Sequence, residues 1–339
     1  MKIKFILLFA CMFSGTVSAR WASLFHKKVT SQEAVVAQHQ KNYFFCQDQV
    51  PRFTQLIFSW NAIRPLKGHF EFSVQARNAY TKQWGAWHRM VAWGKKIQSS
   101  YATPSDGFTK YEHVRLETDR QQYADAFRIK VAGMKGASFA GLKAISATTI
   151  NMRQFHAEST ANITSLASVY LPRVPKISQT AVNHKDNARL CSPVSCAMLT
   201  RYLTNQLIDP IQFADHSYDK GLNAYGSWPF NMAHAFELCN GKYWFFNTRL
   251  NSFVDLHTQL MRGIPVVVSV RGTLPGASQP YLQGHLLLVV GWDNKTKRVI
   301  CHDPAMAKDY DTERRYRLKD FMKAWEQSRR LVYVASHVM

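Results

Sequence analysis

The C-terminal half of the chain contains a cysteine, a histidine and an aspartate whose order suits nucleophilic catalysis by a thiol. Cys191 ends a polar, turn-prone run, and a predicted helix begins at this residue. Pro193 suits the first turn of that helix, because its missing N–H costs nothing there. The unpaired N–H groups and the dipole at the start of a helix favour a thiolate. The sequence therefore predicts a nucleophile at Cys191.

A nucleophilic cysteine needs a base that accepts its proton and an acceptor that orients the base. His285 begins an apolar strand and Asp303 ends the next strand, so adjacent strands would present both side chains at one end of a sheet. Gln179 lies upstream of Cys191, and its amide could join the Cys191 N–H in stabilising an oxyanion. Taken singly, the histidine fits a structural role and the aspartate fits a turn. The order Gln, Cys, His, Asp favours catalysis.

The elements around these positions predict an α+β domain over residues 171–339. Apolar residues recur at helical spacing after Cys191, which gives that helix one face to bury, and again from Pro229 to Cys239. Three strand-like runs follow: 264–270, 285–292 and 298–303. Helices followed by strands are typical of an α+β fold.

The first half of the chain has a two-residue period instead. Apolar and polar residues alternate in three runs separated by turn residues: 55–60, 70–77 and 127–131. This pattern predicts a β-sandwich accessory domain over residues 20–150, with a short helix over residues 31–41. Residues 151–170 are rich in Ser, Thr, Ala and Asn without a sustained period, and we interpret them as a linker.

Four tryptophans lie in this β-rich half: Trp60, Trp84, Trp87 and Trp93. Exposed rings could bind a glycan or a peptide by stacking. The alternative is that the rings fill the core of the sandwich. No catalytic constellation stands out here, so we interpret this half as an accessory module.

The N-terminus, MKIKFILLFACMFSGTVSA, is typical of a secretory signal peptide over residues 1–19. Two lysines precede a short apolar core, and small residues precede a cleavage site after Ala19. A lipid anchor at Cys11 is the alternative, which the bulky Phe9 disfavours. The apolar run is too short to span a membrane, and no later segment approaches the needed length. We therefore expect a secreted or periplasmic protein without a transmembrane segment.

The chain is strongly basic, with 43 Lys and Arg against 22 Asp and Glu and a formal net charge of +21 at pH 7. The basic residues are scattered in short clusters, a pattern that fits contact with an anionic cell-envelope surface. The alternative is that the charge only aids solubility. No nucleic-acid motif is present and export argues against one, so nucleic acid is not an expected partner.

The chain has six cysteines, of which signal cleavage would remove Cys11. Five remain, and an odd number in an oxidising compartment leaves at least one thiol outside internal pairs. Cys191 is our candidate for that thiol. We expect Cys46, Cys196 and Cys301 to be small buried apolar residues. A bridge between Cys196 and Cys239 is conceivable, although sequence does not assign connectivity.

Several segments resemble one family of enzymes from residue 172 to the C-terminus. In chain order they are ISQ, LCSPVSCAMLTRYL, GSWPFN, GIPVVVSV, GHLLLVVGWD, HDPA and RRYRLKDFMKAW. They resemble the papain-like cysteine peptidases related to the bacteriocin-leader-processing peptidase family. That family more often has glycine after the cysteine, where this chain has Ser192. No ATPase motif is present, so the resemblance is to a secreted bacterial form with an N-terminal β-sandwich rather than to the transporter-fused form.

The resemblance implies roles for four residues. Cys191 would be the nucleophile, His285 the base and Asp303 the residue that orients the base. Gln179 would support the oxyanion hole. Neither a metal ion nor a cofactor is expected.

We therefore expect an exported cysteine peptidase that hydrolyses peptide bonds in a peptide or protein substrate through an acyl-enzyme. Trp228 and Asn231, in the GSWPFN segment, are candidates for lining the substrate cleft, with simple packing as the alternative. One rival is a cell-wall amidase or acyltransferase on the same scaffold, because one fold supports several acyl chemistries. The other rival is an envelope-binding protein with a catalytically inactive C-terminal domain.

Overall fold

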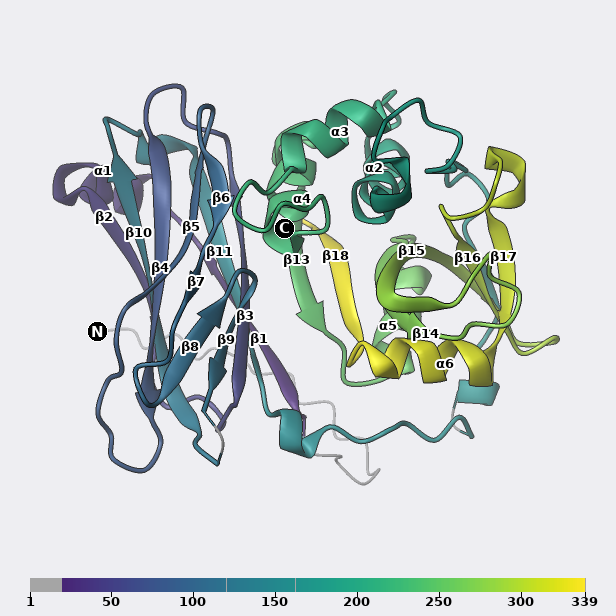
Figure 1. The fold of residues 1–339 in the computed structure, drawn as a ribbon, viewed down its shortest axis with the longest axis horizontal. Coiled ribbons are helices and arrows are strands. Elements are labelled where there is room, and N and C mark those ends of the chain that lie inside the picture. Colours follow the sequence, from purple (N-terminus) through teal and green to yellow (C-terminus); the bar gives the residue numbers. More distant parts are fainter. Residues whose placement is uncertain (1–19, 120, 162, 339) are drawn as a thin grey trace, which may run out of the picture.

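The computed structural model describes residues 20–119, 121–161 and 163–338. The predicted signal peptide, with its cleavage site after Ala19, lies outside these residues. An N-terminal region (residues 20–150) and a C-terminal region (residues 169–338) lie side by side (Figure 1). Within the described ranges, no helix combines the length and the apolar character that a membrane crossing requires.

Two antiparallel sheets face each other in the N-terminal region (Figure 1). Its strands are β1 (Ala22–Lys28), β2 (Asn42–Gln47), β3 (Gln55–Ala62), β4 (His69–Asn78), β5 (His88–Gly94), β6 (Gln98–Ser100), β7 (Ala102–Thr103), β8 (Thr109–Glu112), β9 (Arg115–Thr118), β10 (Ala124–Met134) and β11 (Leu142–Ile150). Leaving residue 120 aside, one sheet has the order β1-β11-β3-β9-β8-β7 and the other β2-β10-β4-β5-β6. Helix α1 (Ser31–Gln40) confirms the short helix predicted from the sequence, so this region is not entirely β.

One apolar core fills the space between these two sheets. In β4, Phe70, Phe72 and Val74 are fully buried while Glu71 is half-exposed, as the alternation predicted. Ser73 departs from it, because it is buried beside a register shift between β4 and β5. Strand β3 departs from the alternation, because all eight of its residues are buried. One of its faces contributes to this core, and the other lies against the C-terminal region.

The four tryptophans divide between the two alternatives that the sequence left open. Two rings fill the core and are fully buried: Trp60 and Trp93. Trp84 is half-buried and Trp87 is 39% exposed. The guanidinium carbon of Arg128 lies 3.8 Å from the centre of the Trp84 ring, and the Nζ of Lys130 lies 5.2 Å from the centre of the Trp87 ring. These two rings therefore lie at the surface, beside cations.

The C-terminal region is one antiparallel sheet with helices on both faces (Figure 1). Its strands are β12 (Val169–Tyr170), β13 (Tyr243–Arg249), β14 (Val266–Gly272), β15 (Tyr281–Asp293), β16 (Arg298–His302), β17 (Glu313–Arg317) and β18 (Leu331–His337). Its helices are α2 (Cys191–Thr204), α3 (Pro210–Ser217), α4 (Trp228–Leu238), α5 (Phe253–Met261) and α6 (Leu318–Gln327). The strand order is β13-β18-β14-β15-β16-β17, with β12 paired to β15. Antiparallel sheets and six helices among the described residues are consistent with the predicted papain-like domain.

Strand β15 lies in the middle of this sheet and is buried on both faces. Leu286, Leu288 and Val290 pack with helices α2, α3 and α4, whereas Leu287 and Val289 pack with α5 and α6. Burial on both faces explains why the sequence of β15 is a continuous apolar run rather than an alternating one.

Helix α2 is more deeply buried than its pattern predicted. The sequence indicated one buried face, but every residue from Ser192 to Thr200 is buried. Helices α3 and α4 contact α2 on the sides that the sheet leaves open. The small polar residues on those sides therefore lie inside the protein.

The segment between the two regions runs along the outside of the C-terminal region (Figure 1). Its described residues include two short 3-10 turns, η2 (Met152–Gln154) and η3 (Ile163–Ser165). Glu158 accepts a hydrogen bond from the Phe253 N–H at 2.7 Å, and Arg330 donates to the His156 carbonyl at 2.9 Å. This segment, which the sequence indicated as a linker, is therefore held against α5 and the turn before β18.

Buried polar and aromatic contacts join the two regions at an interface formed by β3, β6 and β11 with α4, β13 and the loop after α3. Asn61 of β3 is fully buried and pairs with the main chain of Phe245 in β13. It donates to the Phe245 carbonyl at 2.9 Å and accepts from the Phe245 N–H at 2.7 Å. The ring of Phe230 in α4 packs edge-on against Trp60, with centroids 5.6 Å apart. Phe230 thus belongs to the core of the N-terminal region.

Candidate active site

Helix α2 begins at Cys191, as the sequence predicted. Leu190 at the N-cap makes no side-chain hydrogen bond to the first turn, which leaves N–H groups at the helix start near the thiol. Ser195, one turn further on, donates its hydroxyl to the Leu286 carbonyl of β15 at 3.1 Å. Because His285 directly precedes Leu286, this bond fixes the start of α2 beside His285.

The thiol of Cys191 interacts with the imidazole of His285. Burial raises the pKa of the Cys191 thiol, but the hydrogen bond and the charge of His285 outweigh burial, with help from the N–H groups of Leu286 and Ser192. The net effect is a pKa below the ordinary value of a cysteine. As a residue, Cys191 is only partly buried.

His285 and Asp303 form a hydrogen bond of 2.8 Å between Nε2 and Oδ1. The exposed fraction is 4% for His285 and 0% for Asp303. Burial lowers the pKa of His285, but the charge and hydrogen bond of Asp303 and the contact with Cys191 raise it to about 10. Since Nε2 is occupied by Asp303, Nδ1 is the ring nitrogen left for the thiol. The arrangement favours a thiolate beside an imidazolium.

The backbone explains why these two side chains meet. Strands β15 and β16 are antiparallel neighbours, and Leu288 pairs with His302, the residue before Asp303. Gly284, just before His285, has a φ of +94°, a conformation that residues with side chains rarely adopt. The structure therefore brings Cys191, His285 and Asp303 together, as the order of residues predicted.

Two tyrosines that the sequence analysis did not single out complete the surroundings of Asp303. The hydroxyl of Tyr281 donates to Oδ2 of Asp303 at 2.7 Å, and the hydroxyl of Tyr316 donates to the same oxygen at 2.6 Å. Tyr281 stands four residues before His285 on β15, and residues at this even spacing share one face of a strand, which could have indicated it. Tyr316 is the one uncharged residue in the run ERRYR. An aromatic residue among charged ones indicates a single side chain that faces inward.

Gln179 lies beside the same site, and both its backbone and its side chain form hydrogen bonds there. Its N–H donates to the Pro304 carbonyl at 2.8 Å, next to Asp303. Its Nε2 donates to the Ala188 carbonyl at 3.0 Å, in the loop that leads to Cys191. Its buried Oε1 has no partner among the described residues. The predicted oxyanion role would use the second N–H of Nε2, and it stays a prediction.

Trp228 and Asn231, the predicted cleft residues, have packing contacts in α4. Asn231 is fully buried, and its Nδ2 donates to the carbonyls of Tyr225 and Ser227, each at 2.9 Å. Trp228 is half-buried and lies 6.0 Å from the guanidinium of Arg249, at the interface between the two regions. The role of these two residues toward substrate stays a prediction.

Unlike Cys191, the other described cysteines have pKa values raised by burial. All five described cysteines are free thiols, so the conceivable Cys196–Cys239 bridge is not formed. Burial raises the pKa of Cys196, Cys239 and Cys301. Cys46 was expected to be buried, but it is exposed, because alternate residues of β2 face outward. Among the residues that the structure describes, no group of three or more His, Cys, Asp or Glu side chains could hold a metal ion.

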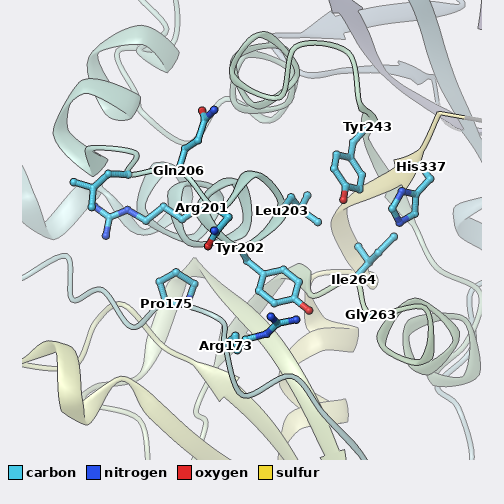
Figure 2. Close-up of a pocket in the computed structure, with 12 residues that line it drawn as sticks. Arg173, Pro175, Arg201, Tyr202, Leu203, Gln206, Tyr243, Gly263, Ile264 and His337 are labelled. Carbon is cyan, nitrogen blue, oxygen red and sulfur yellow. The ribbon is translucent and has the colours of Figure 1, made fainter.

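A separate cavity of about 610 Å³ lies at the other end of α2 (Figure 2). Arg173, Tyr202, Tyr243 and His337 are among the residues that line it. Tyr202 is eleven residues from Cys191, which is about 16 Å along a helix axis. This cavity is therefore distinct from the site around Cys191.

Comparisons with known proteins bear on the C-terminal region only. Residues 172–333 match the model of the Peptidase_C39 like family. Neither a search of curated proteins nor a search of solved structures found a match to the chain. The family match supports a C39-related peptidase, of the cysteine type, that acts on a peptide or protein. It begins at residue 172, so it does not bear on the N-terminal region or on export.

Proposed function

We propose that this protein is an exported cysteine peptidase that hydrolyses peptide bonds through an acyl-enzyme formed on Cys191. One observation carries the proposal: the Cys191 thiol, the His285 imidazole and the buried Asp303 carboxylate interact in series at the start of α2. A thiol with a lowered pKa on a partly exposed residue, next to a histidine held by a carboxylate, is the arrangement that nucleophilic catalysis requires.

In the first half-reaction, the Cys191 thiolate attacks the carbonyl carbon of the scissile amide, and a C–S bond forms. The oxygen becomes an oxyanion that accepts hydrogen bonds from the Cys191 N–H and from Gln179. The imidazolium of His285 then gives its proton to the leaving amine as the C–N bond breaks. The product is a thioester on Cys191.

In the second half-reaction, His285 takes a proton from water, and the resulting hydroxide attacks the thioester carbon. The C–S bond breaks, the acid product leaves, and the thiolate–imidazolium pair is restored. Asp303 stays ionised and orients His285 through both halves, since its Oδ1 accepts a hydrogen bond from the His285 Nε2–H, with 2.8 Å between the two heavy atoms.

Trapping with a peptide-like electrophile, such as a peptidyl chloromethyl ketone, tests the proposal. We expect mass spectrometry of the digested protein to find the adduct on Cys191 and on none of the other four thiols. Cys191→Ala should abolish labelling and hydrolysis, while Cys196→Ala, on the same helix, should retain both. Labelling of another thiol, or activity in Cys191→Ala, would refute the proposal.

Trapping combined with substrate profiling separates the rivals. An amidase or acyltransferase would also acylate Cys191, but it would release cell-wall fragments or transfer the acyl group to an amine instead of cleaving peptides. An inactive envelope-binding protein would leave Cys191 unlabelled. Profiling against a peptide library and against cell-wall fragments therefore distinguishes all three.

The N-terminal region, as a β-sandwich accessory domain, would contact the anionic cell envelope. The net charge of +21 over the whole chain and the surface rings of Trp84 and Trp87, each beside a cation, support this part of the proposal. Binding to vesicles with anionic headgroups, compared with zwitterionic vesicles, tests it. Equal binding to both would refute it. Export predicts a mature N-terminus at Arg20, which N-terminal sequencing of the secreted protein measures.

A further inference from the structure

We propose that Tyr281 and Tyr316 are positioning residues that hold Asp303 in the orientation His285 needs, and that Tyr281 also covers the face of the His285 ring. This inference rests on the proposed function, because it assigns roles around Cys191.

The two oxygens of Asp303 have separate sets of donors. Oδ2 accepts the hydroxyls of Tyr281 at 2.7 Å and Tyr316 at 2.6 Å. Oδ1 accepts the His285 Nε2–H at 2.8 Å and the Ala305 N–H at 3.1 Å. Charge-assisted hydrogen bonds to a carboxylate are short, as the three side-chain bonds are. Rotating the carboxylate would break all four, so the tyrosines keep Oδ1 directed at His285.

Tyr281 makes a second contact that Tyr316 does not make. Its ring stacks on the His285 ring, with centroids 4.0 Å apart and planes at 19°. The Tyr281 side chain is 4% exposed, so this face of the imidazole is shielded from water. An aromatic face over an imidazolium is also electrostatically favourable. Tyr281 thus touches both members of the His285–Asp303 pair.

Tyr316 reaches Asp303 from a different strand. It lies on β17 and is 1% exposed, while the other four residues of that strand are half-exposed or exposed. Strand β17 therefore contributes one side chain to the interior, and its hydroxyl ends on Asp303. A packing role alone would not require that hydroxyl.

The charges around Asp303 fit a positioning role. The groups that face it are His285, Tyr281 and Tyr316, with the Cys301 thiol nearby. Burial raises the pKa of Asp303, but His285 and the two tyrosine hydroxyls outweigh burial and lower it. Burial and Asp303 raise the pKa of both tyrosines, so both hydroxyls keep their protons at neutral and acidic pH and can donate to Asp303. Without the hydroxyls, Asp303 would take up a proton at higher pH.

The test is the pH dependence of Cys191 alkylation by iodoacetamide in Tyr281→Phe, Tyr316→Phe and the double variant. Tyr281→Phe keeps the ring over His285 and removes one hydroxyl, and Tyr316→Phe removes the other. We expect the acid limb of the rate to move to higher pH, with about a tenfold slower rate at mildly acidic pH in each single variant and a larger effect in the double variant. Rates above neutral pH should change little.

Tyr111→Phe is the matched control, because Tyr111 is a fully buried tyrosine in the N-terminal region whose hydroxyl donates to the His113 carbonyl at 3.2 Å. It should leave the pH profile unchanged. Variants that lower the melting temperature but keep the wild-type profile would overturn the inference. If Cys191 of the wild type reacts no faster than Cys46, the proposed function itself fails, which is a different result.

Discussion

Two aspartates are completely buried in the described part of the chain, and they have different kinds of hydrogen-bond partner. Asp219 lies at the interface between the two regions, and its Oδ1 accepts main-chain N–H groups of Ser100, Gly221 and Leu222 at 2.8, 3.0 and 3.3 Å. Asp303 lies beside Cys191 and accepts mainly side-chain donors, from His285 and two tyrosines. Burial of a carboxylate therefore does not by itself indicate function; its partners do.

The choice of partners determines what each carboxylate fixes. Main-chain donors fix the path of the chain, and Asp219 holds the loop after α3 against β6. Asn61 at the same interface also pairs with main chain only. Side-chain donors fix orientation and charge, which chemistry needs. We therefore expect substitutions at the interface to change stability and substitutions around Asp303 to change activity.

Exchanging each aspartate for asparagine gives the largest contrast. Asp303→Asn keeps the shape but removes the charge that supports the His285 imidazolium, so we expect hydrolysis to fall by on the order of 10²–10⁴. Asp219→Asn keeps Oδ1 for its three N–H donors and should retain activity close to the wild type. Steady-state hydrolysis and thermal unfolding of both variants check this. A large activity loss in Asp219→Asn with an unchanged melting temperature would break the comparison.

Asn61→Ala tests whether the interface between the two regions stabilises the protein. It would leave the N–H and the carbonyl of Phe245 unpaired inside the protein, and we expect a loss of about 2–4 kcal/mol in the free energy of unfolding. The folded fraction should hydrolyse substrate at the wild-type rate. Urea unfolding, with Asn42→Ala as a partly exposed control, measures the difference. An effect of Asn61→Ala no larger than that of the control would show that the interface adds little to stability.

The parts of the site that lie on neighbouring elements could be predicted from the sequence. The polar run before Cys191 and Pro193 marks the start of α2, and the apolar runs mark β15 and β16. Consecutive antiparallel strands usually pair, so His285 and Asp303 were expected at one sheet end.

The other parts depend on distant contacts that local patterns do not encode. Tyr316 reaches Asp303 only because β17 pairs with β16 after a loop, and its register follows from packing. The burial of Trp60 and the exposure of Trp87 depend on which strand face meets the opposite sheet. Phe230 packs against Trp60 because α4 lies on β3, a contact between segments more than 150 residues apart.

The smallest expected effect is the difference in alkylation rate between one thiol of the N-terminal region, Cys46, and one of the C-terminal region, Cys191. Burial raises the pKa of Cys46, with Arg128 opposing and Asp48 adding to the rise, whereas the pKa of Cys191 is lowered. At mildly acidic pH, Cys191 should therefore be alkylated at least about tenfold faster than Cys46, because the thiolate is the reactive form. The ratio of the two rates should fall as the pH rises and Cys46 ionises. Mass spectrometry of both peptides after timed iodoacetamide labelling measures the ratio, and Cys46→Ser should leave the Cys191 rate unchanged. A ratio near one at acidic pH, or a ratio that does not change with pH, would mean that His285 does not activate the thiol and that exposure alone determines reactivity.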